Sequence, residues 1–149
     1  MRIGGPLVDA AKVNYGFALS QLGVQLDHAG DLVGAERLYD MSIAIDPAEN
    51  RLSNRALLYM RTGRTELAID GYLEIVKMNP LNAQAHAACG TLCMQLARYE
   101  QAAGLLNRAV ELAPGELDVR YNLGVAFLKL DHPHQALETF LALQVRNPH

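Results

Sequence analysis

Prolines recur along this chain at an almost fixed interval. Pro47, Pro80, Pro114 and Pro148 are separated by 33, 34 and 34 residues. A period of roughly 20 to 50 residues is typical of proteins that stack one structural repeat upon the next. Such arrays present extended surfaces rather than enclosed catalytic pockets. The proline period therefore constrains both the fold and the class of function.

Taking each proline as position 32 of a 34-residue repeat divides the chain into a short extension and four repeats within one domain. The extension is 1–15, which continues the first helix, and the repeats are 16–48 (one residue short), 49–82, 83–116 and 117–149. Position 20 is always alanine, position 8 always glycine or alanine, and position 24 always bulky. In that order the residues are Ala35, Ala68, Ala102 and Ala136; Gly23, Ala56, Gly90 and Gly124; and Tyr39, Tyr72, Leu106 and Phe140.

Each repeat is predicted to be a helical hairpin. Apolar residues recur at helical spacing in two blocks, and a short break such as Thr62-Gly63-Arg64 separates them. Glycine in the break permits the left-handed geometry that ends a helix, and proline at position 32 ends the second helix. Small residues at positions 8 and 20 allow the two helices to approach closely. The first helix is expected to run from near residue 7 to about residue 28.

This pattern resembles the tetratricopeptide repeat family, in which small residues at positions 8 and 20 and proline at position 32 are the signature. The resemblance covers residues 16–149. It departs from the family at position 4, which often holds tryptophan there and here holds Leu19, Leu52, His86 and Arg120. The resemblance implies an all-α, right-handed α-solenoid of four hairpins, in which the first helix of each hairpin lines a concave groove.

The groove implied by the resemblance is the predicted binding surface. Amides at position 6 can pair with a peptide backbone, and apolar residues form a floor on which methionine adapts to varied partners. The predicted site residues are Gln21, Val24, Asn54, Leu57, Met60, Thr91, Met94, Asn122, Val125 and Leu128. The expected partner is a protein or peptide segment with apolar anchors and few charges. Three alternatives stay open: the asparagines bond within the scaffold, Val24 and Val125 pack against neighbouring helices, or the partner binds an edge or the convex face.

One narrower binding function is excluded by the residues. Some family members grip the acidic C-terminus of heat-shock chaperones through lysine, arginine and asparagine at set positions of three consecutive repeats. Starting from the first repeat, those positions hold Ser20, Val24, Asn54, Gln84 and Ala88, of which only Asn54 matches. A carboxylate needs charge-assisted partners, and these positions supply none.

Charge and composition argue against several other classes of function. The net charge is -3 and the pI about 5.9, with no basic patch for nucleic acid. No apolar run is long enough to span a membrane, so the default location is cytoplasmic. No motif indicates catalysis, and the chain is expected to be neither an enzyme nor the holder of a cofactor.

Residues that could bind metal or carry charge have simpler structural interpretations. Cys89 and Cys93 fall at positions that face the hairpin interior and lack two further ligands for zinc. The stretch 131–134, Asp-His-Pro-His, is interpreted as a polar turn, and His28 as a solvated helix end bordering the groove. The carboxylates at repeat junctions are interpreted as solvated: Asp46, Glu49, Glu111 and Glu116.

The C-terminal end raises the question of what covers the last helix. Leu137, Leu141 and Val145 have no following repeat. The chain is expected to belong to a longer array or to self-associate there, or the exposed area is small enough to be tolerated. Two other functions stay open: a chaperone for secreted proteins, and the non-catalytic arm of a larger enzyme such as a glycosyltransferase.

Overall fold

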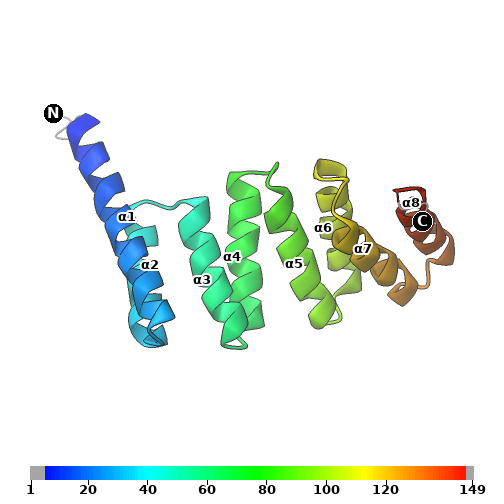
Figure 1. Cartoon of the computed structure of the whole chain (residues 1–149), viewed down its shortest axis with the longest axis horizontal. Coiled ribbons are helices and arrows are strands. Elements are labelled where there is room, and N and C mark those ends of the chain that lie inside the picture. The colour runs from blue at the N-terminus through cyan, green and yellow to red at the C-terminus, as the bar shows by residue number, and fades with distance from the viewer. Residues whose placement is uncertain (1–5, 147–149) are drawn as a thin grey trace. The chain divides into compact units, whose positions relative to one another are not determined.

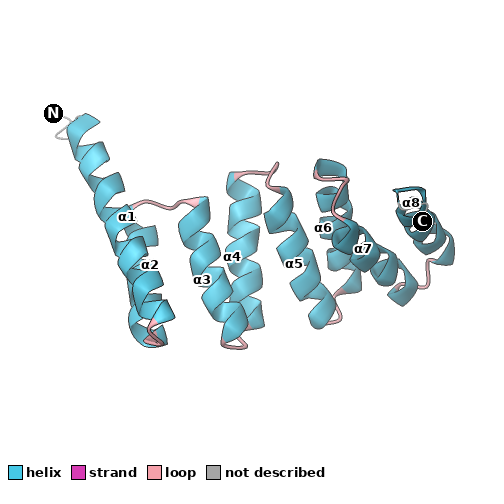
Figure 2. Cartoon of the chain, viewed as in Figure 1, coloured by secondary structure: helices cyan, strands magenta, loops and turns pink. Residues whose placement is uncertain are grey.

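The structure, a computed structural model, describes residues 6–146; the side chains of Leu7, Val145 and Arg146 lie outside that description. The described residues hold eight helices and no strand, joined by short loops (Figures 1 and 2). In chain order they are α1 (Pro6–His28), α2 (Leu32–Ile45), α3 (Glu49–Arg61), α4 (Thr65–Met78), α5 (Ala83–Gln95), α6 (Tyr99–Leu112), α7 (Leu117–Lys129) and α8 (Pro133–Arg146). The first helix therefore starts one residue before the predicted position and ends where expected.

The helices group into two compact units whose boundary falls inside α4. Unit 1 is residues 1–71 and unit 2 is residues 72–149. In unit 1, α1 packs against α2, and α3 contacts both. In unit 2, α5 pairs with α6, α7 pairs with α8, and α7 also packs against α6. Each hairpin within a unit thus packs against a helix of its neighbour, as the repeat pattern requires.

Every hairpin turn contains one residue with a left-handed backbone at position 15 of its repeat. Gly30 has φ of 87° and Gly63 of 74°, as glycine at these positions predicted. The same geometry occurs at Ala97, with φ of 56°, and at Asp131, with φ of 58°. Left-handed geometry costs a residue with a Cβ about 1–2 kcal/mol. The fold therefore imposes this turn even where the sequence does not favour it.

Helix boundaries follow the signals in the sequence. Pro47, Pro80 and Pro114 each lie two residues beyond the end of a second helix, whereas Pro148 lies outside the described residues. Asp31 caps α2 by accepting a hydrogen bond from the Gly34 amide at 2.9 Å. A side chain that accepts from an amide of the first helical turn replaces a bond that the helix itself cannot supply.

Small residues at position 8 accommodate the bulky residue at position 24 of the same repeat. A Cβ added to Gly90 would lie 2.7 Å from Leu106, and one added to Gly124 would lie 2.6 Å from the Phe140 ring. At Gly23 the ring of Tyr39 would be 2.9 Å away. The alanines at position 20 are all buried. The predicted close approach of the paired helices is confirmed by these contacts.

The cysteines belong to the core of unit 2. Cys89 and Cys93 are fully buried on α5. Their interpretation as buried structural cysteines is confirmed.

One junction carboxylate was wrongly interpreted as solvated. Asp46, in the loop between α2 and α3, forms an ion pair at 2.9 Å with Arg51, whose side chain is almost fully buried. The same guanidinium donates to the Asp46 carbonyl at 2.5 Å and to the Val13 carbonyl at 3.2 Å. Arg51 therefore ties the early turns of α1 to the loop before α3. The sequence pattern did not predict this contact.

The last helix exposes apolar side chains, as predicted. Leu137 is 56% exposed and Leu141 is 49% exposed. The side chain of Val145, which belonged to the same prediction, lies outside the described residues.

Candidate functional site

The predicted site residues fall into one set in each unit. Those of unit 1 lie on α1 and α3: Gln21, Val24, Asn54, Leu57 and Met60. Those of unit 2 lie on α5 and α7: Thr91, Met94, Asn122, Val125 and Leu128. All ten therefore lie on the first helices of their hairpins, and none is fully buried. These helices also contact each other within their unit, α1 with α3 and α5 with α7.

In unit 1 the structure brings three predicted residues together around an open cleft. The cleft has a volume of about 270 Å³ and is lined by Val24, Asp27 and His28 of α1, Tyr39 of α2, and Asn54, Leu57 and Arg61 of α3. Leu57 is 47% exposed. The cleft therefore offers an apolar contact, an amide and charged groups within one small volume.

Val24 has two roles in this cleft. It packs against the buried cluster formed by Ala35, Tyr39 and Leu58, and its other side lines the cleft. The alternative that Val24 packs against neighbouring helices is therefore correct in part. Because the residue belongs to the core as well as the surface, replacing it would disturb both.

An ion pair crosses the rim of the cleft. Arg61 of α3 donates to the carboxylate of Asp27 on α1, whose side chain is only 11% exposed. Burial, followed by the negative charge of Asp27, raises the pKa of Tyr39 above its ordinary value, while Arg61 acts against that shift. The hydrogen bond to Asp27 raises the pKa of Arg61. The three side chains therefore form one coupled polar wall beside Val24 and Leu57.

This polar wall is the part of the cleft that sequence reasoning missed. Neither Asp27 nor Arg61 is among the predicted site residues, and their pairing was not predicted. A signal was available, since the two residues are 34 apart, one more than the 33-residue spacing between the first two repeats. Opposite charges at neighbouring positions of consecutive first helices would have indicated the pair.

The side-chain amides at position 6 form no hydrogen bond within the described part of the chain. Asn54 and Asn122 are half-buried and Gln21 is exposed. Within residues 6–146 their side chains form no hydrogen bond, so the alternative that they bond within the scaffold finds no support there. An unpaired amide keeps donors and an acceptor for a ligand.

The unit 2 set is mostly apolar. Leu128 is 54% exposed, and Val125 and Met94 are half-buried. The Thr91 hydroxyl donates to the Ala87 carbonyl of its own helix at 2.9 Å, so its donor is already used. Tyr121 lies on the same helix as Leu128 and is 56% exposed; its ring centroid is 5.9 Å from that of Phe140.

The described part of the chain holds neither a membrane-spanning helix nor a cluster of metal ligands. None of its helices maintains an apolar stretch of the kind that crosses a bilayer. Between residues 6 and 146, no three His, Cys, Asp or Glu side chains are grouped so that they could share a metal ion.

Sequence comparisons relate the chain to several curated proteins. It is 29% identical over 118 residues to the photosystem I assembly protein Ycf3 of Prochlorococcus marinus (strain MIT 9303), covering 76% of this chain and 67% of the relative. It is 31% identical over 94 residues to the TPR repeat-containing thioredoxin TTL4 of Arabidopsis thaliana. That match covers 62% of this chain but only 14% of the longer protein.

Solved structures share the fold. A crystal structure of MamA superposes with a TM-score of 0.82 at 23% identity, covering 90% of this chain and 74% of MamA. MamA from Desulfovibrio magneticus RS-1 gives a TM-score of 0.73 at 22% identity, with coverage of 87% and 73%. At this level of identity the likeness concerns the fold alone.

The family model agrees with the repeat pattern. Residues 53–116 match the tetratricopeptide repeat, a range that contains most of the second predicted repeat and all of the third. The predicted fold class, an all-α solenoid of helical hairpins, is confirmed by the helices and by the structural likenesses. The match of residues 53–116 to the family model, together with the related sequences, shows that the chain contains tetratricopeptide repeats.

Proposed function

We propose that the chain is a non-catalytic interaction module that binds a peptide segment of another protein through the first helices of its hairpins. Tetratricopeptide repeat proteins act as interaction and assembly scaffolds, and the Prochlorococcus relative is named as an assembly protein. The observation that carries the proposal is the unit 1 cleft, in which Asn54 has no partner among the described residues and Leu57 is exposed beside it.

The chemistry of the cleft defines the expected peptide. Leu57 and Val24 provide an apolar surface for one aliphatic or aromatic anchor. The Asn54 amide is placed to bond the peptide backbone next to that anchor, which needs no particular side-chain sequence. Asp27 and Arg61 already neutralise each other, so the cleft favours a ligand with an uncharged segment at this point.

The test starts from peptides chosen without bias. A random displayed library is selected on the full chain, and the tightest peptide is titrated calorimetrically against wild type, Asn54→Ala and Leu57→Ala. We expect each variant to weaken binding by about tenfold, which corresponds to about 1.4 kcal/mol. Helicity should stay unchanged, because neither side chain belongs to the buried core.

A matched control distinguishes the loss of the Asn54 amide in the cleft from the loss of any surface amide. Asn107 is an exposed asparagine on α6 that bonds Glu111 of its own helix at 3.2 Å. Asn107→Ala should leave the affinity as in wild type. If Asn54→Ala and Leu57→Ala bind as tightly as wild type and Asn107→Ala, the unit 1 cleft is not the binding surface.

Self-association through the last hairpin stays a second prediction. The exposed Leu137 and Leu141 on α8 favour it. Sedimentation of wild type beside Leu141→Glu tests it, since a charge on this face should shift a dimer towards monomer. A wild-type chain that stays monomeric at high concentration contradicts it.

A further inference from the structure

The junction between the first two repeats holds a bound guanidinium that belongs to the chain itself. Arg51, at position 3 of the second repeat, is only 3% exposed. It donates to Asp46 and to the Val13 carbonyl, and it lies so close to Gly16 that an added Cβ would be 2.6 Å from its Nη1. This part of the repeat can therefore enclose a planar cation when an acidic side chain is near.

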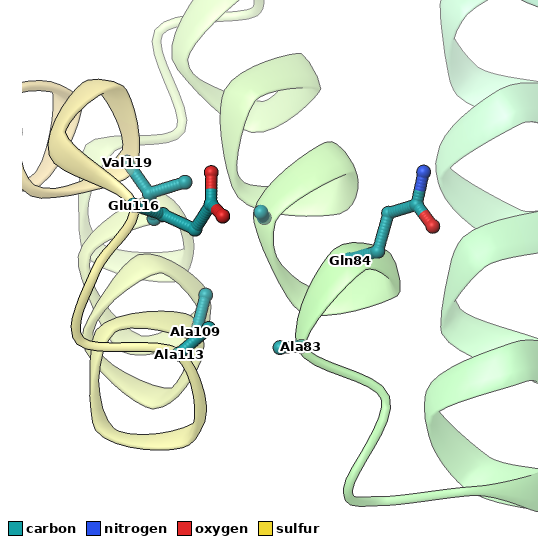
Figure 3. Close-up of a pocket in the computed structure, with 7 residues that line it drawn as sticks. Ala83, Gln84, Ala109, Ala113, Glu116 and Val119 are labelled. Carbon is teal, nitrogen blue, oxygen red and sulfur yellow. The ribbon is translucent and has the colours of Figure 1, made fainter.

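The equivalent positions of unit 2 line an open cleft. Ala83, Ala113 and Val119 occupy the repeat positions that Gly16, Asp46 and Arg51 occupy in unit 1. The cleft has a volume of about 380 Å³, and its lining is completed by Gln84, Ala87, Ala109 and Glu116 (Figure 3). Valine is much shorter than arginine. The space that the chain fills in unit 1 is therefore accessible in unit 2.

The unit 2 cleft also keeps a carboxylate. In Figure 3 the Glu116 side chain extends from the start of α7 towards α5, whereas the Gln84 amide points away from it. Within the described residues, the Glu116 carboxylate takes part in no ion pair or hydrogen bond. Arg120, the nearest cation along the chain, donates instead to the Pro114 carbonyl at 3.2 Å. The cleft thus combines alanine side chains on its walls with a carboxylate that has no partner among the described residues.

We propose that this cleft binds an arginine side chain of a partner polypeptide. The aliphatic stem of an arginine can lie along the alanine walls while its guanidinium pairs with the Glu116 carboxylate. A planar guanidinium suits a carboxylate in two-point geometry, whereas a lysine ammonium acts as a point charge. The site goes beyond the function proposed above, because it lies wholly in unit 2 and recognises a charge.

The probe is N-acetyl-arginine amide, titrated into the full chain at millimolar concentration and followed by the backbone amide resonances. Saturable shifts are expected at Ala83, Ala87 and Val119. The citrulline analogue has nearly the same shape without the charge and should cause no saturable shift. Equal shifts with both probes, or none with either, overturn the proposal.

Two substitutions test whether the arginine side chain binds in this cleft. Glu116→Gln removes the charge and keeps the shape, so arginine binding should weaken by about tenfold or more. Val119→Arg copies the arrangement of Arg51 and should block the probe by filling the cleft from within. If arginine binds Glu116→Gln as well as wild type, the carboxylate is not the recognition group and the proposal fails. These outcomes are independent of Asn54 and Leu57, which lie in unit 1.

Discussion

Unit 1 and unit 2 are built from the same repeat, yet different chemistry joins their helices. In unit 1, Arg55 and Arg64 of the second repeat pair with Asp40 and Glu36 of α2. Both guanidinium groups also lie over the Tyr59 ring, 5.8 Å and 4.6 Å from its centroid. In unit 2 the ion pair of Arg108 with Glu111 stays within one helix, and α5 packs through buried cysteine, leucine and alanine.

This difference shows which parts of the repeat are constrained. Positions 8, 20 and 24 set the distance between paired helices, and they keep their character in both units. The type of residue at position 7 is not constrained in this way, since this position holds Arg55 in one repeat and Cys89 in the next. The hairpin geometry is thus kept along the chain, while position 7 carries an ion-paired arginine in unit 1 and a buried cysteine in unit 2.

The largest expected effect is at Arg51, where unit 1 depends most on charge. Arg51→Met keeps much of the aliphatic stem but removes three hydrogen bonds and leaves the Asp46 carboxylate without its cation. Breaking a buried pair costs about 3–5 kcal/mol; because Asp46 is one-third exposed, we expect about 2–3 kcal/mol here. Hydrogen exchange should show the loss in α1 and α3.

Arg108→Met is the matched control in unit 2. Both partners of the Arg108–Glu111 pair are about half exposed, so its loss should cost at most about 0.5 kcal/mol. Equal losses for Arg51→Met and Arg108→Met would contradict the view that the two units are joined differently.

The apolar packing of unit 2 is tested next, at Gly90. In Gly90→Ala the new methyl would meet Leu106 at 2.7 Å, and overpacking of this kind costs about 1–3 kcal/mol. Gly104, on α6, has nothing within 4 Å of the added carbon. Gly104→Ala should therefore stabilise its helix by about 0.5–1 kcal/mol. Thermal unfolding of both variants checks the opposite signs; the same sign for both would show that packing at position 8 is not limiting.

A smaller effect is expected at the turns, which both units share. Ala97 adopts φ of 56°, so Ala97→Gly should relieve strain and stabilise unit 2 by about 0.5–1 kcal/mol. Gly63→Ala introduces the same strain into unit 1 and should destabilise it by about 1 kcal/mol. Denaturant unfolding measures both. A destabilised Ala97→Gly would mean that chain entropy outweighs the relief of strain.

The smallest effect concerns alkaline pH and unit 1. Burial raises the pKa of Tyr39 above 10.0, and burial likewise raises that of Tyr59. A raised pKa means that the folded state holds the proton more tightly, so the contribution is complete below about pH 10 and is lost as the pH rises through the shifted value. The free energy of unfolding should therefore fall above pH 10, and Tyr39→Phe should reduce that pH dependence. An unchanged dependence would show that Tyr39 does not contribute.

The sequence predicts the hairpins well because their determinants are local. The break at Thr62-Gly63-Arg64, the prolines beyond α2, α4 and α6, and the alanines at position 20 each act within one repeat. Ala97 and Asp131 show a limit, since their left-handed geometry could be inferred only from their place in the repeat.

The contacts between hairpins were harder to predict because they depend on the reach of long side chains. Arg51 bonds a carbonyl 38 residues away, and no local pattern indicates that its guanidinium turns inward. The cleft beside Glu116 was likewise hard to predict, because it is open only where the short side chain of Val119 leaves space. The amides at Asn54 and Asn122 were identified from the repeat register alone, and their role in binding stays a prediction.

The central claim, that partners bind the first helices of the hairpins, can be tested through the methionines. Met60 and Met94 lie on α3 and α5, whereas Met41 and Met78 lie on the second helices α2 and α4. With methyl-labelled methionine in the full chain, the library-selected peptide is titrated and each methyl resonance is followed. We predict saturable shifts at Met60 or Met94, with Met41 and Met78 unchanged. Shifts confined to Met41 and Met78 would contradict the account and place the partner on the second helices instead.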